Sequence, residues 1–117
     1  MKIREIKDLL QAEIVCGEDQ LDREVISACC SDMMSDVLAY VKDQGVLLTG
    51  LVNAQTIRTA GMMDMVCIVF VRDKRPTDSM IELAQECGIV LMYTALRAYE
   101  ASGRLYHAGL GRSTSHE

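Results

Sequence analysis

The feature that most constrains the fold of this chain is an unbroken run of seven apolar residues at positions 65–71, MVCIVFV. The run is rich in β-branched residues and is shorter than a typical buried helix, so it predicts a strand. Neither face of such a strand has a polar side chain to show to water. A strand that is buried on both faces is typical of a parallel sheet covered by helices on both sides.

Strand-like and helix-like segments alternate along the rest of the chain. Strands are predicted at 13–16, 24–30, 46–49 and 89–92. Helices are predicted at 2–11, 31–41, 54–63, 77–87 and 94–102. This alternation predicts one α/β domain with a mixed, mostly parallel sheet flanked by helices. We expect the domain to cover residues 1–110 and a disordered polar tail to follow at 111–117.

Composition and charge exclude several classes of partner. The net charge is -5 and 4% of the residues are aromatic, without a basic stripe, so we expect no nucleic-acid partner. No apolar run reaches the roughly 18 residues that a spanning helix needs, so we expect no membrane partner. The first ten residues, MKIREIKDLL, are charged throughout and lack the apolar core of a signal peptide. These features predict a cytoplasmic protein.

Residues 21–41 combine a polar lead-in, a β-prone run and the start of a helix. The helix has Met34, Val37, Leu38 and Val41 on one apolar face. Two Ser-Asp pairs, 31–32 and 35–36, place polar side chains at the junction between the strand and this helix. Gly45 is predicted to end the helix, because glycine commonly follows a helix C-terminus.

Four strand–helix junctions carry polar residues, at 31–32, 49–53, 72–77 and 93–94. If the strands are parallel, these junctions gather at one edge of the sheet, where α/β proteins usually bind ligands. Free N–H groups at the helix N-termini there would attract an anion. The alternative is that polar residues such as Asn53, Thr77 and Thr94 only cap their own helices. The sequence leaves both interpretations open.

The chain shows no catalytic motif. It contains no P-loop, no glycine-rich dinucleotide fingerprint and no nucleophile elbow. Its two histidines, His107 and His116, lie near the C-terminus. Asp32 and Asp36 lie one helical turn apart, but two carboxylates alone are a weak metal signal. We therefore predict a non-catalytic protein with no metal site and no cofactor.

The five cysteines do not form a metal-binding or redox motif with C-x-x-C spacing. In a cytosolic chain they are expected to be small buried residues, with Cys87 on the apolar face of its helix. Cys29 and Cys30 are adjacent, and neighbours on a strand point to opposite faces. A redox or metal-dependent function that uses this pair is the alternative interpretation.

Several spaced motifs in this chain resemble those of the DRTGG domain family. They are residues 21–25 (LDREV), Ser31-Asp32, residues 35–37 (SDV), Asn53, residues 87–91 (CGIVL) and residues 101–106 (ASGRLY). The resemblance extends over about residues 1–110. One departure is that Ser27-Ala28 stands where the family has a glycine pair. Losing that pair affects any ligand contact that its backbone would make.

The resemblance implies a regulatory or assembly function. DRTGG domains accompany CBS domains in regulated pyrophosphatases and occur in some phosphotransacetylases. Their fold is similar to that of the N-terminal domain of HPr kinase/phosphorylase. Stand-alone copies often occur near genes for iron-only hydrogenase, which would be the setting of the redox alternative.

Together these observations predict a module that binds a small anionic ligand, with an adenine nucleotide as one candidate, or a partner protein. The predicted ligand-binding residues are Asp22, Arg23, Ser31, Asp32, Ser35, Thr49 and Asn53. Arg23 would supply the charge contact, and the Ser, Thr and Asn side chains would supply hydrogen bonds.

A homodimer is also predicted. The chain has eight methionines, and Met33, Met62 and Met63 lie near segment ends, where an adaptable apolar contact would form. The resemblance also implies a position at subunit contacts. The alternative is that the methionines fill the core.

Overall fold

The computed structural model describes residues 1–40 and 44–111 of the chain. Its elements are, in chain order, α1 (Ile3–Leu10), β1 (Glu13–Cys16), a short 3-10 helix η1 (Glu18–Gln20), β2 (Ser27–Cys30), α2 (Met34–Tyr40), β3 (Gly45–Thr49), α3 (Ala54–Met62), β4 (Cys67–Phe70), α4 (Asp78–Cys87), β5 (Val90–Tyr93) and α5 (Ala98–His107). The polar tail expected at 111–117 lies, apart from Gly111, outside the described residues.

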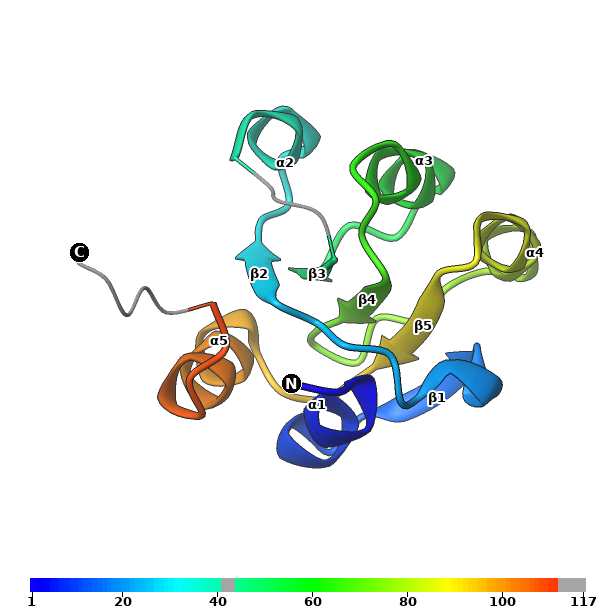
Figure 1. Ribbon diagram of the computed structural model, residues 1–117. Helices are drawn as coiled ribbons and strands as arrows, with labels where there is room; N and C mark the ends of the chain where they lie inside the picture. The colour runs from blue at the N-terminus through cyan, green and yellow to red at the C-terminus, as the bar shows by residue number, and fades with distance from the viewer. Residues whose placement is uncertain (41–43, 112–117) are drawn as a thin grey trace.

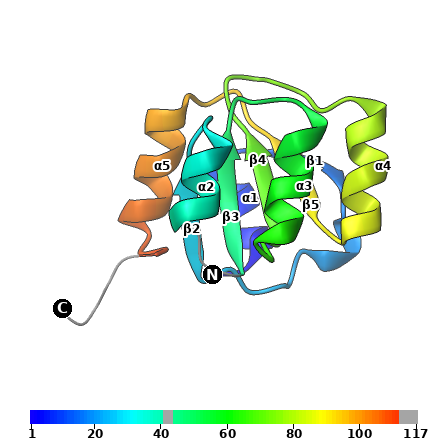
Figure 2. The ribbon, with the colours of Figure 1, turned by 90° about the horizontal axis from the view of Figure 1, so that it is seen from above.

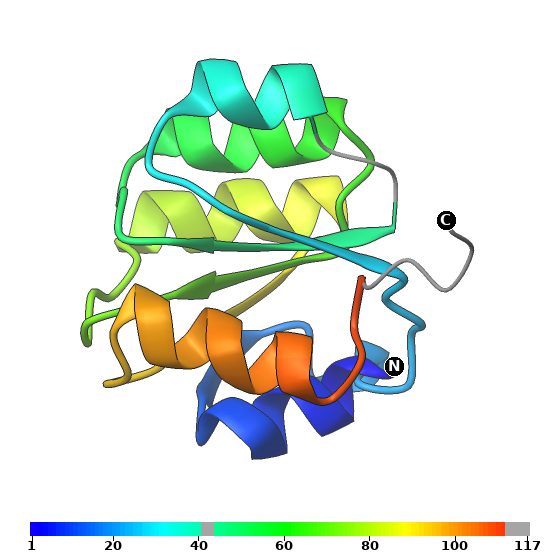
Figure 3. The ribbon, with the colours of Figure 1, turned by 90° about the vertical axis from the view of Figure 1, so that its left-hand side faces the viewer.

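The strands form one sheet in the order β1-β5-β4-β3-β2 (Figure 1). β2, β3, β4 and β5 run parallel, and β1 pairs antiparallel with β5. Figure 3 shows α2, α3 and α4 on one side of the sheet and α1 and α5 on the other. The predicted α/β domain with a mixed, mostly parallel sheet is therefore confirmed. No helix in the described part of the chain is long and apolar enough to cross a membrane.

The apolar run at 65–71 forms β4, the middle strand of the sheet, and all of its residues are buried. Cys67 and Val69 pack into the core cluster that α1 and α5 cover. Ile68 and Phe70 pack into the cluster on the side of α2, α3 and α4. The alternation of side chains along a strand thus gives each helical layer its own half of the core.

The stretch from 24 to 45 differs from the prediction at three points. Of the strand predicted at 24–30, only Ser27–Cys30 pairs with β3 as a strand. The helix α2 begins at Met34 and not at residue 31. Gly45 is the first residue of β3 and does not end the helix. The helix begins late because the Met33 N–H donates to Ser31 Oγ at 2.9 Å, which makes a turn before the helix. The predicted apolar position Val41 lies outside the described residues.

Two of the three predicted helix caps are confirmed. Asn53 accepts a hydrogen bond from the Thr56 N–H, and Thr77 accepts one from the Met80 N–H. Thr94 is not a cap, because α5 begins only at Ala98. The buried Thr94 hydroxyl instead donates to the Leu10 carbonyl at 2.7 Å and ties the end of β5 to α1.

The helix predicted at 94–102 would turn Tyr99 towards the core, and the helix predicted at 77–87 would turn Cys87 the same way, but both side chains are exposed. Tyr99 is 90% exposed, because α5 starts later than predicted and its buried face is formed by Ala101 and Leu105. Cys87, at the last position of α4, is also exposed. The buried side chains of α4 are Met80 and Ala84.

Candidate functional site

The carboxyl ends of β2, β3, β4 and β5 lie on one edge of the sheet, because these strands are parallel. In Figure 2 the connections from these strands to α2, α3, α4 and α5 run along the top of the view. All four predicted junctions are therefore gathered at this carboxyl edge. The amino ends of the same strands lie at the opposite edge.

Asp32 links the ends of two neighbouring strands at this edge. Its Oδ1 accepts hydrogen bonds from the Thr49 hydroxyl at 2.9 Å and from the Gly50 N–H at 2.7 Å. The Gly50 N–H is the main cause that lowers the pKa of Asp32, and the Thr49 hydroxyl and the Arg72 charge lower it further. Asp32 is thus an ionised carboxylate that joins the exit of β2 to the exit of β3.

Arg72 reaches the same point from the end of β4. Its Nη2 lies 3.8 Å from Asp32 Oδ2. The guanidinium lies over Gly50, where the Cβ of any other residue would clash with Nη2. Gly50 is therefore the residue that leaves room for Arg72.

The backbone at Arg72 adopts an unusual conformation. Arg72 has a φ of 59° and Asp73 a φ of 57°, so two successive non-glycine residues are left-handed. Such residues cost about 1–3 kcal/mol each and persist where the surroundings hold them. Here the Arg72 N–H donates to the Leu96 carbonyl and the Asp73 N–H to the Thr94 carbonyl, each at 2.8 Å. The turn after β4 is thus tied to the loop after β5.

A pocket of about 440 Å³ opens at this edge between the ends of β2, β3 and β4 and the start of α5. Its polar side chains include the two arginines Arg72 and Arg97, the hydroxyls of Ser31 and Thr49, and the Asp32 carboxylate. We call this the carboxyl-edge pocket. Arg97 is also the N-cap residue of α5, whose first turn has no side-chain cap. Positive charge therefore comes from two loops that are distant in sequence.

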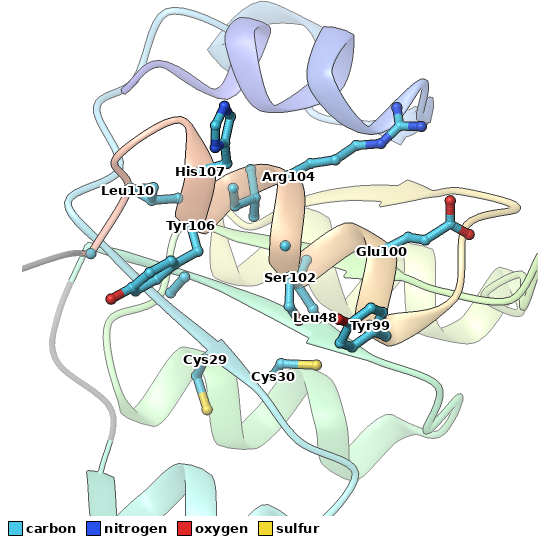
Figure 4. Close-up of a pocket in the computed structure, with 14 residues that line it drawn as sticks. Cys29, Cys30, Leu48, Tyr99, Glu100, Ser102, Arg104, Tyr106, His107 and Leu110 are labelled. Atoms are coloured by element: carbon cyan, nitrogen blue, oxygen red, sulfur yellow. The ribbon is translucent and has the colours of Figure 1, made fainter.

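A second pocket, an apolar groove of about 820 Å³, runs between β2 and α5 (Figure 4). Ala28 and Cys30 pair with Val46 and Leu48, so their side chains share the α5 side of the sheet. Because both side chains are small, they leave a hollow beside α5. Cys30 and Tyr99 line both the groove and the carboxyl-edge pocket, so the two spaces adjoin.

The predicted site residues separate into two groups. Ser31, Asp32 and Thr49 meet at the carboxyl-edge pocket. Asn53 lies at the same edge but is used as the α3 cap, and Ser35 is exposed in the first turn of α2.

Asp22 and Arg23 lie at the opposite edge. Arg23 Nη1 donates to the Gly88 carbonyl at 2.9 Å, just before β5, and Asp22 pairs with Arg4 at 3.1 Å. The separation arises because both residues precede β2, whereas Ser31 follows it.

Sequence reasoning missed four residues of this region: Gly50, Arg72, Arg97 and Tyr99. The first two lay in junctions that the sequence marked, but nothing local showed that they would meet. Arg97 and Tyr99 were missed because the start of α5 was predicted four residues too early. A count of cationic residues close to the predicted strand ends would have found Arg72.

The cysteines show no shared site. All five are free, and the side chains of Cys29 and Cys30 point in different directions from β2 (Figure 4). Burial raises the pKa of Cys29, and the neighbouring Cys30 and Asp36 raise it further. Burial also raises the pKa of Cys16. In the part of the chain that the structure describes, no three His, Cys, Asp or Glu side chains are grouped to hold a metal ion.

Comparison with known proteins agrees with this architecture. No curated protein matches the chain. Among solved structures, it is similar to the CBS and DRTGG domains of the regulatory region of Clostridium perfringens pyrophosphatase, complexed with the activator diadenosine tetraphosphate. The TM-score is 0.71 at 16% identity, and the match covers 89% of this chain but 45% of that one. Residues 5–108 match the DRTGG domain family. The chain therefore belongs to the DRTGG domain family.

Proposed function

We propose that this DRTGG domain is a non-catalytic regulatory module that binds an anionic ligand, an adenine nucleotide, in the carboxyl-edge pocket. The observation that carries the proposal is the convergence of the Arg72 and Arg97 side chains on one pocket. Guanidinium groups are donors that bind phosphate oxygens well. The five free cysteines support a reducing compartment such as the cytoplasm.

The adjoining groove favours a nucleotide over a simple anion as the ligand. An adenine base needs an apolar surface and an aromatic ring for stacking. Tyr99 lines both the groove and the carboxyl-edge pocket, and its ring offers such a surface next to the two arginines. The similar pyrophosphatase region is complexed with an adenine nucleotide and is itself regulatory, which supports both the ligand class and the non-catalytic role.

The charge of Asp32 affects which form of the nucleotide can bind. Its carboxylate faces the same pocket as the arginines and would repel a phosphate group. A divalent cation bound to the nucleotide removes this repulsion, because Mg²⁺ is held by one or two carboxylates together with phosphates. We therefore expect the magnesium form of the nucleotide to bind more tightly than the free form.

Calorimetric titration with AMP, ADP and ATP, with and without magnesium, tests the proposal. Arg72→Ala should weaken binding by about tenfold or more, because a charged hydrogen bond contributes about 1.5–3 kcal/mol. Arg58→Ala is the matched control, since Arg58 is an exposed arginine on α3 outside the pocket. Absence of binding to all three nucleotides, or equal loss in both variants, would refute the proposed site and favour a partner protein as the ligand.

We also propose that the module acts as a homodimer. Met33 and Met62 are 61% and 71% exposed. Met33 precedes α2 at the carboxyl edge, whereas Met62 ends α3 at the opposite edge. The two side chains therefore do not form one apolar patch. Sedimentation equilibrium should give twice the chain mass of 13.0 kDa, and the single chain mass would refute the homodimer.

The redox alternative rests on Cys30, which is exposed and lines both pockets. A reactive thiol is a thiolate, and the raised pKa of Cys29 disfavours the thiolate form of Cys29. Counting the thiols of the folded protein that react at pH 7, with Cys30→Ser as the comparison, tests the alternative. If Cys30 does not react, this function is excluded.

A further inference from the structure

Thr94, the residue directly after β5, is a buried polar residue that the proposed site does not use. It is 2% exposed and lines neither the groove nor the carboxyl-edge pocket. Its hydroxyl donates to the Leu10 carbonyl at 2.7 Å and accepts a hydrogen bond from the Leu96 N–H at 3.2 Å. A buried hydroxyl that both donates and accepts fixes the groups on either side of it.

The end of α1 gives this contact a rigid base. Leu10 is the last residue of α1, and the carbonyls in the last turn of a helix have no donor within the helix. Thr94 supplies a donor to the Leu10 carbonyl, and Arg104 of α5 supplies one to the neighbouring Leu9 carbonyl at 2.9 Å. Because α1 and α5 lie on the same side of the sheet (Figure 3), the loop between β5 and α5 is fastened to α1 from both of its ends.

The same loop holds the backbone of both arginines of the carboxyl-edge pocket. The Thr94 carbonyl accepts a hydrogen bond from the Asp73 N–H, and the Leu96 carbonyl accepts one from the Arg72 N–H, each at 2.8 Å. These two bonds hold the left-handed turn that carries Arg72. Arg97 directly follows Leu96, whose N–H donates to the Thr94 hydroxyl. The positions of Arg72 and Arg97 therefore both depend on the loop segment that Thr94 fixes.

We propose that Thr94 is a positioning residue for the nucleotide: without contacting the ligand, its hydroxyl keeps Arg72 and Arg97 directed at the carboxyl-edge pocket. This role rests on the proposed function and adds the residue on which the convergence of the two arginines depends. Both arginine side chains are exposed and carry like charges, so their repulsion opposes that convergence. A backbone that is fixed before the ligand arrives reduces the conformational freedom that binding has to remove.

Thr94→Val tests this role, because valine has nearly the shape of threonine but lacks the hydroxyl. Calorimetric titration of the folded variant with ATP and magnesium should show an affinity about tenfold lower than that of the wild type, the loss expected for one charged hydrogen bond. Thr94→Ser keeps the hydroxyl and should restore most of the affinity. Thr59→Val is the matched control, since Thr59 is a buried threonine on α3 that lines neither pocket.

Amide hydrogen exchange without ligand separates positioning from a general loss of stability. In Thr94→Val the amides of Arg72 and Asp73 should exchange about three- to tenfold faster than in the wild type, because the carbonyls that accept their hydrogen bonds are no longer fixed. A purely global loss of stability would accelerate the β4 amides, which exchange on global unfolding, and would leave exchange by local opening unchanged. Thr59→Val should not accelerate exchange at Arg72 or Asp73.

Unchanged ATP affinity in a folded Thr94→Val, or unchanged exchange at Arg72 and Asp73, would overturn the role of Thr94 and leave the proposed function intact. If Thr94→Val does not fold, the wild type decides. ATP should then slow exchange at Arg72, Asp73 and Leu96 together, and protection of only one of the two loops would overturn the role. A wild type that binds no nucleotide would refute the proposed function, and the unliganded exchange would still decide whether Thr94 holds the two loops together.

Discussion

At the scale of single residues, the carboxyl-edge pocket depends on Gly50 and Asp32 as much as on its arginines. Gly50 donates its N–H to Asp32 and leaves the space that the Arg72 guanidinium occupies. Asp32 holds Thr49 and Gly50 through one oxygen and faces Arg72 with the other. Neither residue needs to touch a ligand to affect its binding.

Gly50→Ala should weaken nucleotide binding about as much as Arg72→Ala. The new Cβ displaces the guanidinium, and since Arg72 is a flexible surface side chain the free energy of unfolding should change by less than about 1 kcal/mol. Parallel calorimetric titrations and urea unfolding curves would measure both quantities. Gly103→Ala is the control, because its Cβ meets no atom within 4 Å and lies outside the carboxyl-edge pocket. Unchanged affinity in Gly50→Ala would contradict the assigned position of Arg72.

The Asp32 carboxylate should also make stability depend on pH. Its folded-state pKa lies below the ordinary value of 3.8, so its stabilising effect is complete above about pH 4 and is lost as the pH falls through the folded-state pKa. The difference in unfolding free energy between wild type and Asp32→Asn should therefore be larger at pH 6 than at pH 2.5. Chemical denaturation at the two pH values measures it. A difference that grows in acid would show that this network does not hold the carboxylate ionised.

At the scale of elements, the start of each helix decides which side chains reach the carboxyl edge. α3 and α4 begin at side-chain caps, and both starts were predicted from the residues themselves. α5 has no side-chain cap, and its start was predicted too early at Thr94. That shift changes the helical face to which Tyr99 belongs, and with it the groove that Tyr99 lines.

Asn53→Ala should destabilise the domain by about 0.5–2 kcal/mol, because it removes the acceptor for the Thr56 N–H at the start of α3. Urea unfolding followed by circular dichroism measures the change. Ser35→Ala is the control, since Ser35 is exposed within α2 and a surface substitution of this kind stays within about 0.5 kcal/mol. Equal effects of the two substitutions would show that the Asn53 cap does not stabilise α3.

At the scale of the whole molecule, β4 is the centre of the structure. It lies between β3 and β5, and both helical layers pack on it. β1 lies at one end of the sheet, pairs only with β5 among the described strands, and is partly exposed. The free energy of local opening should therefore rise from the edge of the sheet towards its centre.

Native-state hydrogen exchange should show this gradient. The amides of β4 are expected to exchange only on global unfolding, whereas those of β1 should exchange through local openings of lower free energy. Measuring exchange at several low urea concentrations would separate the two classes. If the β4 amides were among the fastest to exchange, its assignment as the central strand would be wrong.

The sequence by itself determined the layered α/β architecture and the edge of the sheet at which the polar strand–helix junctions gather. A run without polar residues at 65–71 has to be buried on both faces, and alternating strands and helices have to cover it. Caps at Asn53 and Thr77 are equally local, because each uses a backbone N–H three residues away. These properties need only short stretches of chain, so they can be predicted from the residues alone.

Only the tertiary structure decided which side chains meet. Asp22 and Arg23 seemed to belong with Ser31, but the length of β2 places them at opposite edges of the sheet. Arg72 joins Asp32 because β2, β3 and β4 end side by side and Gly50 leaves room above β3. A contact between distant residues depends on strand order, on the direction of each strand and on the rotation of each helix. Those quantities are properties of the packed sheet, and no single stretch of this sequence contains them.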